Sequence, residues 1–196
     1  KKNIRIDFAY TSYLKRANST LKIILENMKL ENIGFTKSWE FNERHYGSLT
    51  GLNKSEMKEQ LGEEKIKIYR RSWDIAPPEL SEDSEFNPRN DIIYKDINED
   101  AIPNTESLKD TYDRVIPYFN INIRPKILAG KNVIIAAHGN SLRALCKLLF
   151  NISNENINKL EIPTGNPLLV KLDSDLKFIS AYYLDETRAQ TIIQNK

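Results

Sequence analysis

The stretch Val133–Ser141, VIIAAHGNS, joins a short apolar run to a histidine, a glycine and small polar residues. A continuous apolar run of this length is typical of a strand that is buried on both faces of a parallel sheet. Leu142, Leu145 and Leu149 then recur at helical spacing, which predicts a helix that starts two or three residues after His138. A buried strand that runs straight into a helix indicates an α/β fold.

The same alternation extends outward from this stretch in both directions. We expect further strands at residues 4–10, 35–41, 168–172 and 178–184, and helices at 13–29, 54–61, 63–72 and 105–130. Thr11 and Ser12 offer capping chemistry for the first of these helices. Residues 76–104 are rich in Pro, Asn, Asp, Glu and Ser and read as a long surface loop. Strands that alternate with helices imply a layered α/β arrangement, and we expect one domain over residues 1–196.

Composition excludes several classes of partner. The chain has 196 residues, of which 40% are hydrophobic and 29% charged, as in ordinary globular proteins. The formal net charge of +2 is too small to favour nucleic acid as the default partner. The longest apolar run, Val133–Ala137, is far shorter than a membrane span. One cysteine, Cys146, excludes an internal disulfide and fits a reducing compartment.

His138 stands where an α/β sheet usually binds its ligand, at the carboxyl end of a strand. The helix that follows offers free N–H groups and partial positive charge, which suit an anion. Gly139 permits close approach of the backbone, and a histidine titrating near neutral pH can donate to a phosphate oxygen. The alternative is a core histidine bonded to a backbone carbonyl.

The stretch Asn42–Gly47, NERHYG, gathers a carboxylate, a guanidinium, an imidazole and a phenol after a predicted strand. Glu43 is a candidate general acid and base, and Arg44 a candidate phosphate ligand. The alternative is a solvated turn with an ion pair.

Other basic side chains stand near predicted helix termini. Arg16 and Lys54 lie close to helix starts, where a cation opposes the helix dipole and a ligand phosphate would compensate it. Arg70 and Arg71 follow on a second helix. For each of them, a solvated basic surface is the competing interpretation. Two histidines and one cysteine without clustering argue against a zinc site, and neither a phosphate-binding Gly-rich loop nor a Gly-x-Ser-x-Gly elbow occurs.

Taken together, several motifs resemble the cofactor-dependent phosphoglycerate mutases of the histidine phosphatase superfamily, in the order of that family and over nearly the whole chain. They are Tyr10–Ala17, Asn42–Gly47 with Gly51–Lys54, Arg70–Ser72 with Pro77–Pro78, Glu106–Asp110, Ala136–Ala144 and Ile162–Gly165. The resemblance implies a three-layer sandwich with a mostly parallel sheet.

The resemblance also implies roles for individual residues. Glu43 matches the proton donor and acceptor for the substrate hydroxyl groups, and Arg16 and His138 match the pocket of the transferred phosphoryl group. Gly139 and Asn140 lie beside that pocket in the motif. The residues matching those that grip the substrate's carboxylate and second phosphate are Arg44, Tyr46, Lys54, Arg70 and Arg71.

The implied activity is the glycolytic and gluconeogenic interconversion of 3- and 2-phosphoglycerate through a phosphohistidine. It implies 2,3-bisphosphoglycerate as the primer, no metal, a cytoplasmic homodimer or homotetramer, and small phosphoglycerates as the only partners, with neither nucleic acid nor membrane. A bisphosphoglycerate mutase or phosphatase shares the pocket and stays open as an alternative. A catalytically silent module that binds phosphoglycerates is a second alternative.

One departure from the family motivates the silent alternative. The family carries its phosphoryl group on the histidine of an Arg-His-Gly motif in its first strand, and this sequence has no such motif. Arg44-His45-Tyr46 looks similar but belongs to the Glu43 segment. We expect the chain to be truncated before Lys1. Since that strand is central in the family's sheet, we also expect its neighbours to be left with unpaired edges.

Overall fold

A computed structural model describes residues 4–192, which form two compact units. The first unit combines the part of the chain before Arg44 with the part after Tyr112, and the second is Arg44–Tyr112. The expected single domain over 1–196 stays a prediction. Among residues 4–192, no helix has both the length and the apolar character that crossing a membrane requires.

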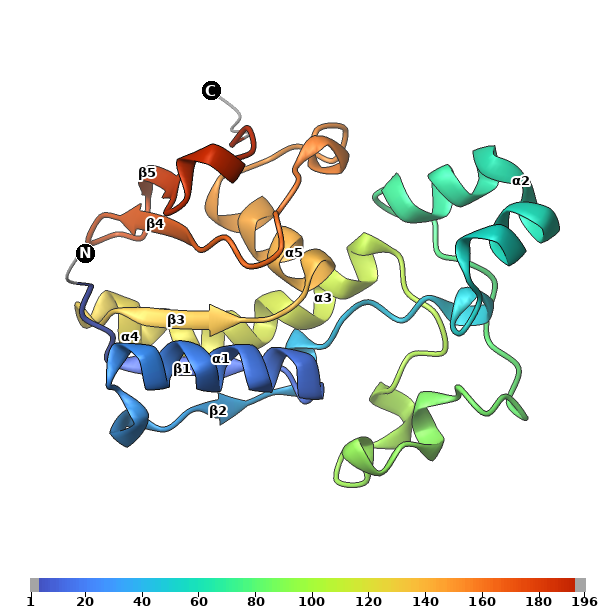
Figure 1. Ribbon diagram of the computed structural model, residues 1–196, viewed down its shortest axis with the longest axis horizontal. Coiled ribbons are helices and arrows are strands. Elements are labelled where there is room, and N and C mark those ends of the chain that lie inside the picture. Colours follow the sequence, from blue (N-terminus) through green and yellow to red (C-terminus); the bar gives the residue numbers. More distant parts are fainter. Residues whose placement is uncertain (1–3, 193–196) are drawn as a thin grey trace. The chain divides into compact units, whose positions relative to one another are not determined.

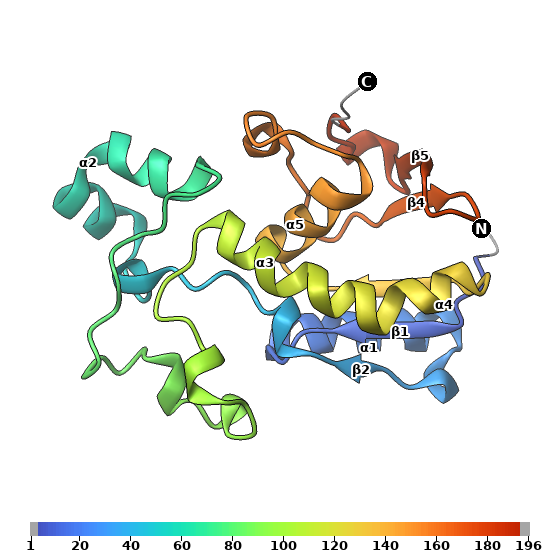
Figure 2. The same ribbon diagram turned by 180° about the vertical axis from the view of Figure 1, so that it is seen from behind.

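The first unit is built on a three-stranded parallel sheet (Figure 1). Its strands are β1 (Phe8–Thr11), β2 (Thr36–Lys37) and β3 (Val133–Ala136), in the order β2-β1-β3. Helix α1 (Lys15–Met28) covers one face, and the helical stretch after Asp113 covers the other (Figures 1 and 2). The expected mixed α/β class with a parallel sheet is therefore confirmed.

Strands β1 and β3 pair directly, in parallel, with Phe8 opposite Val133 and Thr11 opposite Ala136. Among the described residues, β1 is paired on both sides and β3 on one side only, so the expectation of an unpaired edge is wrong for β1 and stays a prediction for β3. The Thr11 hydroxyl strengthens the pairing by donating to the Ala136 carbonyl over 2.8 Å. The carboxyl ends of the two strands consequently meet at one edge of the sheet.

The core beneath α1 follows from its amphipathic pattern. Leu21 and Leu25, one turn apart, are 0% and 3% exposed and pack with Ala9 of β1 and Ala136 of β3. Burying such side chains contributes roughly 1.5–3 kcal/mol each. This packing fixes the start of α1 beside the ends of β1 and β3.

Three elements differ clearly from their sequence pattern. The strand expected over 4–10 is only Phe8–Thr11. The strand expected over 35–41 is only Thr36–Lys37, since the chain turns into a short 3-10 helix at Trp39–Phe41. The helix expected over 105–130 begins as α3 (Leu108–Tyr118), widens to a π-turn at Phe119–Ile123 and ends as α4 (Arg124–Leu128). Pro117 lies in the last turn of α3, where its missing N–H weakens the regular ladder.

The remainder of the first unit begins with α5 (Gly139–Leu149), which follows β3 as expected but starts one or two residues earlier than predicted. Strands β4 (Leu168–Leu172) and β5 (Phe178–Tyr183) then pair antiparallel as a sheet of their own. The described strands thus form two separate sheets, the parallel sheet of β1, β2 and β3 and the antiparallel pair of β4 and β5.

The second unit contains α2 (Lys54–Arg71), whose Asn53 cap and Glu56 form the predicted capping box. Gly62 interrupts α2 with a φ of 76°, as expected from its place between two helical patterns. The predicted loop over 76–104 contains only short 3-10 turns, at Pro88–Asn90, Ile92–Tyr94 and Glu99–Ala101.

Candidate functional site

His138 lies at the edge where β1 and β3 end, and it is 6% exposed. Its Nε2 is 2.8 Å from the Oγ of Ser12, which directly follows β1. Its Nδ1 accepts from the Nε–H of Arg16 in the first turn of α1, over 3.1 Å. The structure therefore brings Arg16 and His138 together, as the sequence motifs predicted.

These two contacts fix the protonation of the imidazole. A guanidinium only donates, so Nδ1 must be the acceptor and the proton of a neutral ring sits on Nε2. Nε2–H then donates to Ser12 Oγ, which also accepts from the Leu14 N–H over 3.1 Å. Ser12 thus orients His138. The expected capping of α1 by Thr11 or Ser12 is wrong, because the N-cap residue is Leu14 and no described side chain caps the helix.

Electrostatics also favour the neutral ring. Burial, followed by the positive charge of Arg16, lowers the pKa of His138 from 6.5 to about 4, with Glu43 opposing and Arg114 adding to the effect. The expected titration near neutral pH is wrong for this environment. The alternative of a core histidine predicted a hydrogen bond from the ring to a backbone carbonyl. The ring instead contacts the side chains of Ser12 and Arg16.

Glu43 points its carboxylate at the start of α5. Its Oε1 accepts from the side-chain Nδ2 of Asn140 over 2.9 Å and from the Asn140 backbone N–H over 3.3 Å. A helix N-terminus stabilises a carboxylate through both its N–H groups and its dipole. Gly139 opens the helix, and apart from its chain neighbours and the backbone of its own helix no described atom lies within 4 Å of the place its Cβ would take. The space beside Gly139 therefore leaves room for a ligand.

Sequence reasoning missed Arg114. Its guanidinium donates to the carbonyl of Glu40, to that of Asn42 over 3.1 Å and to that of Glu43 over 3.4 Å. The same group lies 5.5 Å from the centre of the Trp39 ring. Arg114 thereby holds the backbone that carries Glu43. No local signal marks it, because a single arginine on an amphipathic helix usually faces solvent.

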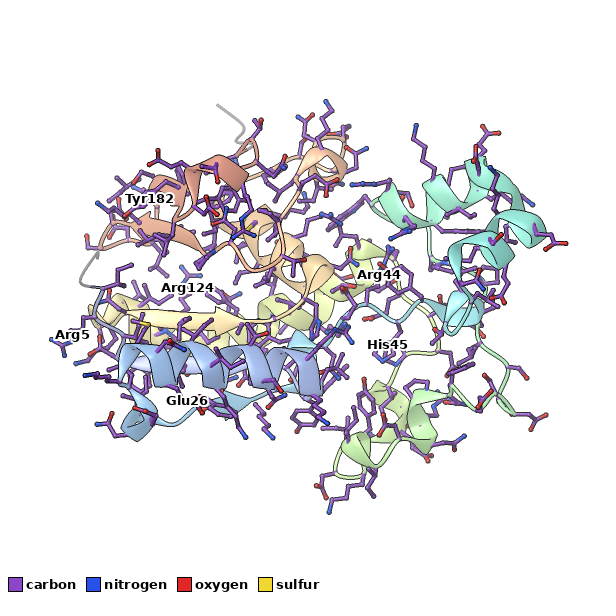
Figure 3. All side chains as sticks on the ribbon, in the orientation of Figure 1. Arg5, Glu26, Arg44, His45, Arg124 and Tyr182 are labelled. Carbon is purple, nitrogen blue, oxygen red and sulfur yellow. The ribbon has the colours of Figure 1, made fainter. Side chains whose placement is uncertain are left out.

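The predicted substrate-gripping residues belong to the second unit. Arg44, labelled in Figure 3, is 2% exposed, donates to the Tyr69 carbonyl over 3.0 Å and lies 4.6 Å from the centre of the Tyr46 ring. Lys54 is the first residue of α2. Arg70 and Arg71 are exposed in its last turn, where positive charge complements the helix dipole.

A buried cluster beside Arg44 was also missed. His45 lies 2.9 Å through Nδ1 from the Glu106 carboxylate and 3.0 Å through Nε2 from the Tyr94 hydroxyl. The backbone N–H of His45 donates to the same Glu106 oxygen over 2.9 Å. These contacts tie the 76–104 loop to the segment that carries Arg44 and Tyr46. The pattern offered no signal, since the three residues are far apart in sequence.

Metal-binding side chains do not gather within residues 4–192: groups of His, Cys, Asp or Glu large enough to hold an ion are absent there. The chemistry at the edge of the sheet is instead that of an anion site. It combines a guanidinium, an imidazole N–H donor and a helix N-terminus with one carboxylate, a set suited to positioning a phosphoryl group and moving a proton.

Comparison with known proteins identifies relatives of the chain. The histidine phosphatase superfamily (branch 1) matches residues 1–97 and 81–184. A protein of Pelagibacter ubique, named 2,3-bisphosphoglycerate-dependent phosphoglycerate mutase, is 51% identical over 97% of this chain and 79% of its own length. A protein of the same name from Lachnoclostridium phytofermentans is 52% identical, over 95% and 75% respectively.

Solved structures share the fold at lower identity. Bacillus stearothermophilus YhfR superimposes with a TM-score of 0.63 and 16% identity, covering 96% of this chain and 77% of that one. A mycobacterial glucosyl-3-phosphoglycerate phosphatase gives 0.61 and 17%, covering 93% and 76%.

Proposed function

Because this chain belongs to the histidine phosphatase superfamily, we propose that it interconverts 3-phosphoglycerate and 2-phosphoglycerate by way of a phosphohistidine. The observation that carries the proposal is the 51% identity, over 97% of the chain, to a relative named as a phosphoglycerate mutase. We propose 2,3-bisphosphoglycerate as the primer that first phosphorylates the enzyme. A homodimer or homotetramer in the cytoplasm is part of the same proposal.

Arg16 and His138 bind the transferred phosphoryl group in this proposal. The Arg16 side chain is exposed, and a guanidinium has donors beyond the Nε–H that His138 accepts. Neutral His138 has one N–H donor, on Nε2, which must leave Ser12 Oγ to donate to a phosphoryl oxygen. A loose phosphoryl-transfer transition state spreads charge over its equatorial oxygens, so fixed donors of this kind stabilise it.

Glu43 moves the proton in this proposal. As the phosphoryl group leaves the phosphohistidine for a substrate hydroxyl, that oxygen loses its proton to the Glu43 carboxylate. On transfer of the other phosphoryl group back to the histidine, Glu43 returns the proton to the hydroxyl that is released. Gly139 and Asn140 lie beside the reacting oxygens in this proposal, and Asn140 holds the carboxylate.

The second unit supplies the substrate grip in this proposal. Arg44, Tyr46, Lys54, Arg70 and Arg71 bind the carboxylate and the second phosphate of the substrate. A bisphosphoglycerate mutase or phosphatase would use the same groups, but the names of the relatives near 50% identity do not favour that alternative.

A direct test is the intact mass of the native protein before and after incubation with 2,3-bisphosphoglycerate, with turnover assayed in parallel. We expect a phosphoryl adduct and formation of 2-phosphoglycerate from 3-phosphoglycerate. Binding of phosphoglycerate without adduct or turnover would instead establish the silent binding module. Residues 1–196 contain only His45 and His138, so peptide mapping of the adduct would also locate the phosphohistidine.

A further inference from the structure

The Asn140 side chain lies between Glu43 and Arg143 and contacts both. Its Nδ2 donates to Glu43 Oε1 over 2.9 Å, and its Oδ1 accepts from Arg143 Nη1 over 2.9 Å. Asn140 and Arg143 are three residues apart on α5, so their side chains leave the same face of the helix. Asn140 is 5% exposed, and both of these hydrogen bonds are partly buried.

The contact with Arg143 determines which way the amide faces. Arginine has only donors, so the Asn140 atom beside Nη1 must be the carbonyl oxygen. This leaves the NH₂ group facing Glu43. The reverse orientation would set the amide oxygen against a carboxylate and the NH₂ group against a guanidinium, and both contacts would be repulsive.

Arg143 is itself held in place. Its Nε donates to the carbonyl of Leu160 over 3.0 Å, and Leu160 is fully buried. One side of the guanidinium is thus anchored to the backbone that leads into Glu161–Gly165, and the other side reaches Asn140. A planar guanidinium can meet two such acceptors at once, which an ammonium group cannot do in the same geometry.

We infer that Arg143 is a positioning residue for the Glu43 carboxylate and acts through the Asn140 amide. The inference rests on the proposed function, in which Glu43 carries the proton. With the amide locked, Glu43 Oε1 is fixed by two N–H groups of one residue. Without Arg143, the amide can rotate and the carboxylate follows it.

The kinetic expectation is a loss confined to the chemical step. Misplacing a reacting group by about 1 Å lowers the rate by up to about 100-fold. Arg143→Met keeps the apolar stem and removes both hydrogen bonds, so we expect kcat to fall roughly 10- to 100-fold with KM nearly unchanged. A fall in thermal stability with unaltered kcat would mean that Arg143 only anchors Leu160, and would overturn the inference.

A double-mutant cycle separates the two roles further. Asn140→Ala removes the intermediate group, so Arg143→Met should have almost no further effect on kcat in that background. Additive losses would contradict action through Asn140. Arg124→Met is the matched control, since Arg124 donates to Asn120 on the surface, over 3.5 Å, and α4 lies beside the start of β3 rather than its end (Figures 1 and 3).

The deciding measurement is independent of turnover. The side-chain NH₂ resonances of Asn140, assigned with Asn140→Ala, should shift in Arg143→Met and in Glu43→Gln but not in Arg124→Met. Unchanged Asn140 resonances in Arg143→Met would overturn the positioning inference. Absence of turnover in the native protein would instead overturn the proposed function, so the two failures are distinguishable.

Discussion

The Nε atom of Arg16 lies 3.1 Å from the Nδ1 atom of His138, with the arginine as the only possible donor. A protonated imidazole carries hydrogen on both nitrogens and could not accept this bond. The contact therefore selects a neutral histidine that donates from Nε2 towards Ser12. It leaves the positive charge of the site on Arg16.

The first prediction concerns stability against pH. Because the pKa of His138 is about 4 in the folded chain and 6.5 ordinarily, the unfolded chain binds more protons between these values. The stabilisation is complete above pH 6.5 and is lost as pH falls towards 4. The free energy of unfolding, measured with urea, should fall by on the order of 1–3 kcal/mol as the pH is lowered through this range. His138→Gln cannot titrate, so an equal loss in that variant would contradict the assignment.

The second prediction concerns the charge on Arg16. Arg16→Met removes the positive charge that lowers the pKa of His138, so that pKa should rise. Binding of 2,3-bisphosphoglycerate should weaken on the order of 10-fold or more, as expected for loss of a charge-assisted bond. NMR titration and calorimetry measure the two effects. Lys15→Met, which removes the neighbouring exposed cation, should change neither.

The third prediction concerns Arg114. Arg114→Met leaves the carbonyls of Glu40, Asn42 and Glu43 without this donor, and hydrogen bonds to a charged group contribute roughly 1.5–3 kcal/mol each. We expect about 2–4 kcal/mol lower free energy of unfolding by urea titration. Arg5→Met removes the exposed ion pair with Asp7. It should change the free energy of unfolding by no more than about 0.5 kcal/mol. Equal effects of the two would contradict the role of Arg114.

The fourth prediction concerns Gly47 in the second unit. Its φ is +55°, and an added Cβ would lie 2.1 Å from the Pro78 carbonyl oxygen. Gly47→Ala should therefore lower the free energy of unfolding by about 3 kcal/mol or more, because backbone strain and steric overlap act together. Gly130 has a φ of +73° with open space around its Cβ position. Gly130→Ala should therefore lower the free energy of unfolding by only about 1–2 kcal/mol. Comparable melting temperatures for the two variants would refute this.

The periodic parts of the chain are the ones that could be predicted from sequence. The apolar run before His138 and the leucines after it place β3 and α5 to within about two residues, because burial on a sheet and burial on a helix leave different spacings in the sequence. The Asn53–Glu56 capping box also has a local cause and was found.

Features that depend on long-range contacts could not be predicted. The sequence places Glu43 after a strand, but the contact of its carboxylate with Asn140 arises only once β1, β3 and α5 are packed. Arg114 is invisible for the same reason, since its acceptors are backbone carbonyls some 70 residues away. His138 was assigned a near-neutral pKa because burial is not apparent from the motif itself.

The most direct measurement of the central claim compares the native protein with its Glu43→Gln variant in forming 2-phosphoglycerate from 3-phosphoglycerate. The proposal predicts steady turnover by the native protein and loss of most of it in Glu43→Gln, with substrate affinity retained, because the amide keeps the shape and cannot accept the proton. Turnover in Glu43→Gln equal to that of the native protein would remove Glu43 from the mechanism. No interconversion by the native protein would contradict the proposed function itself.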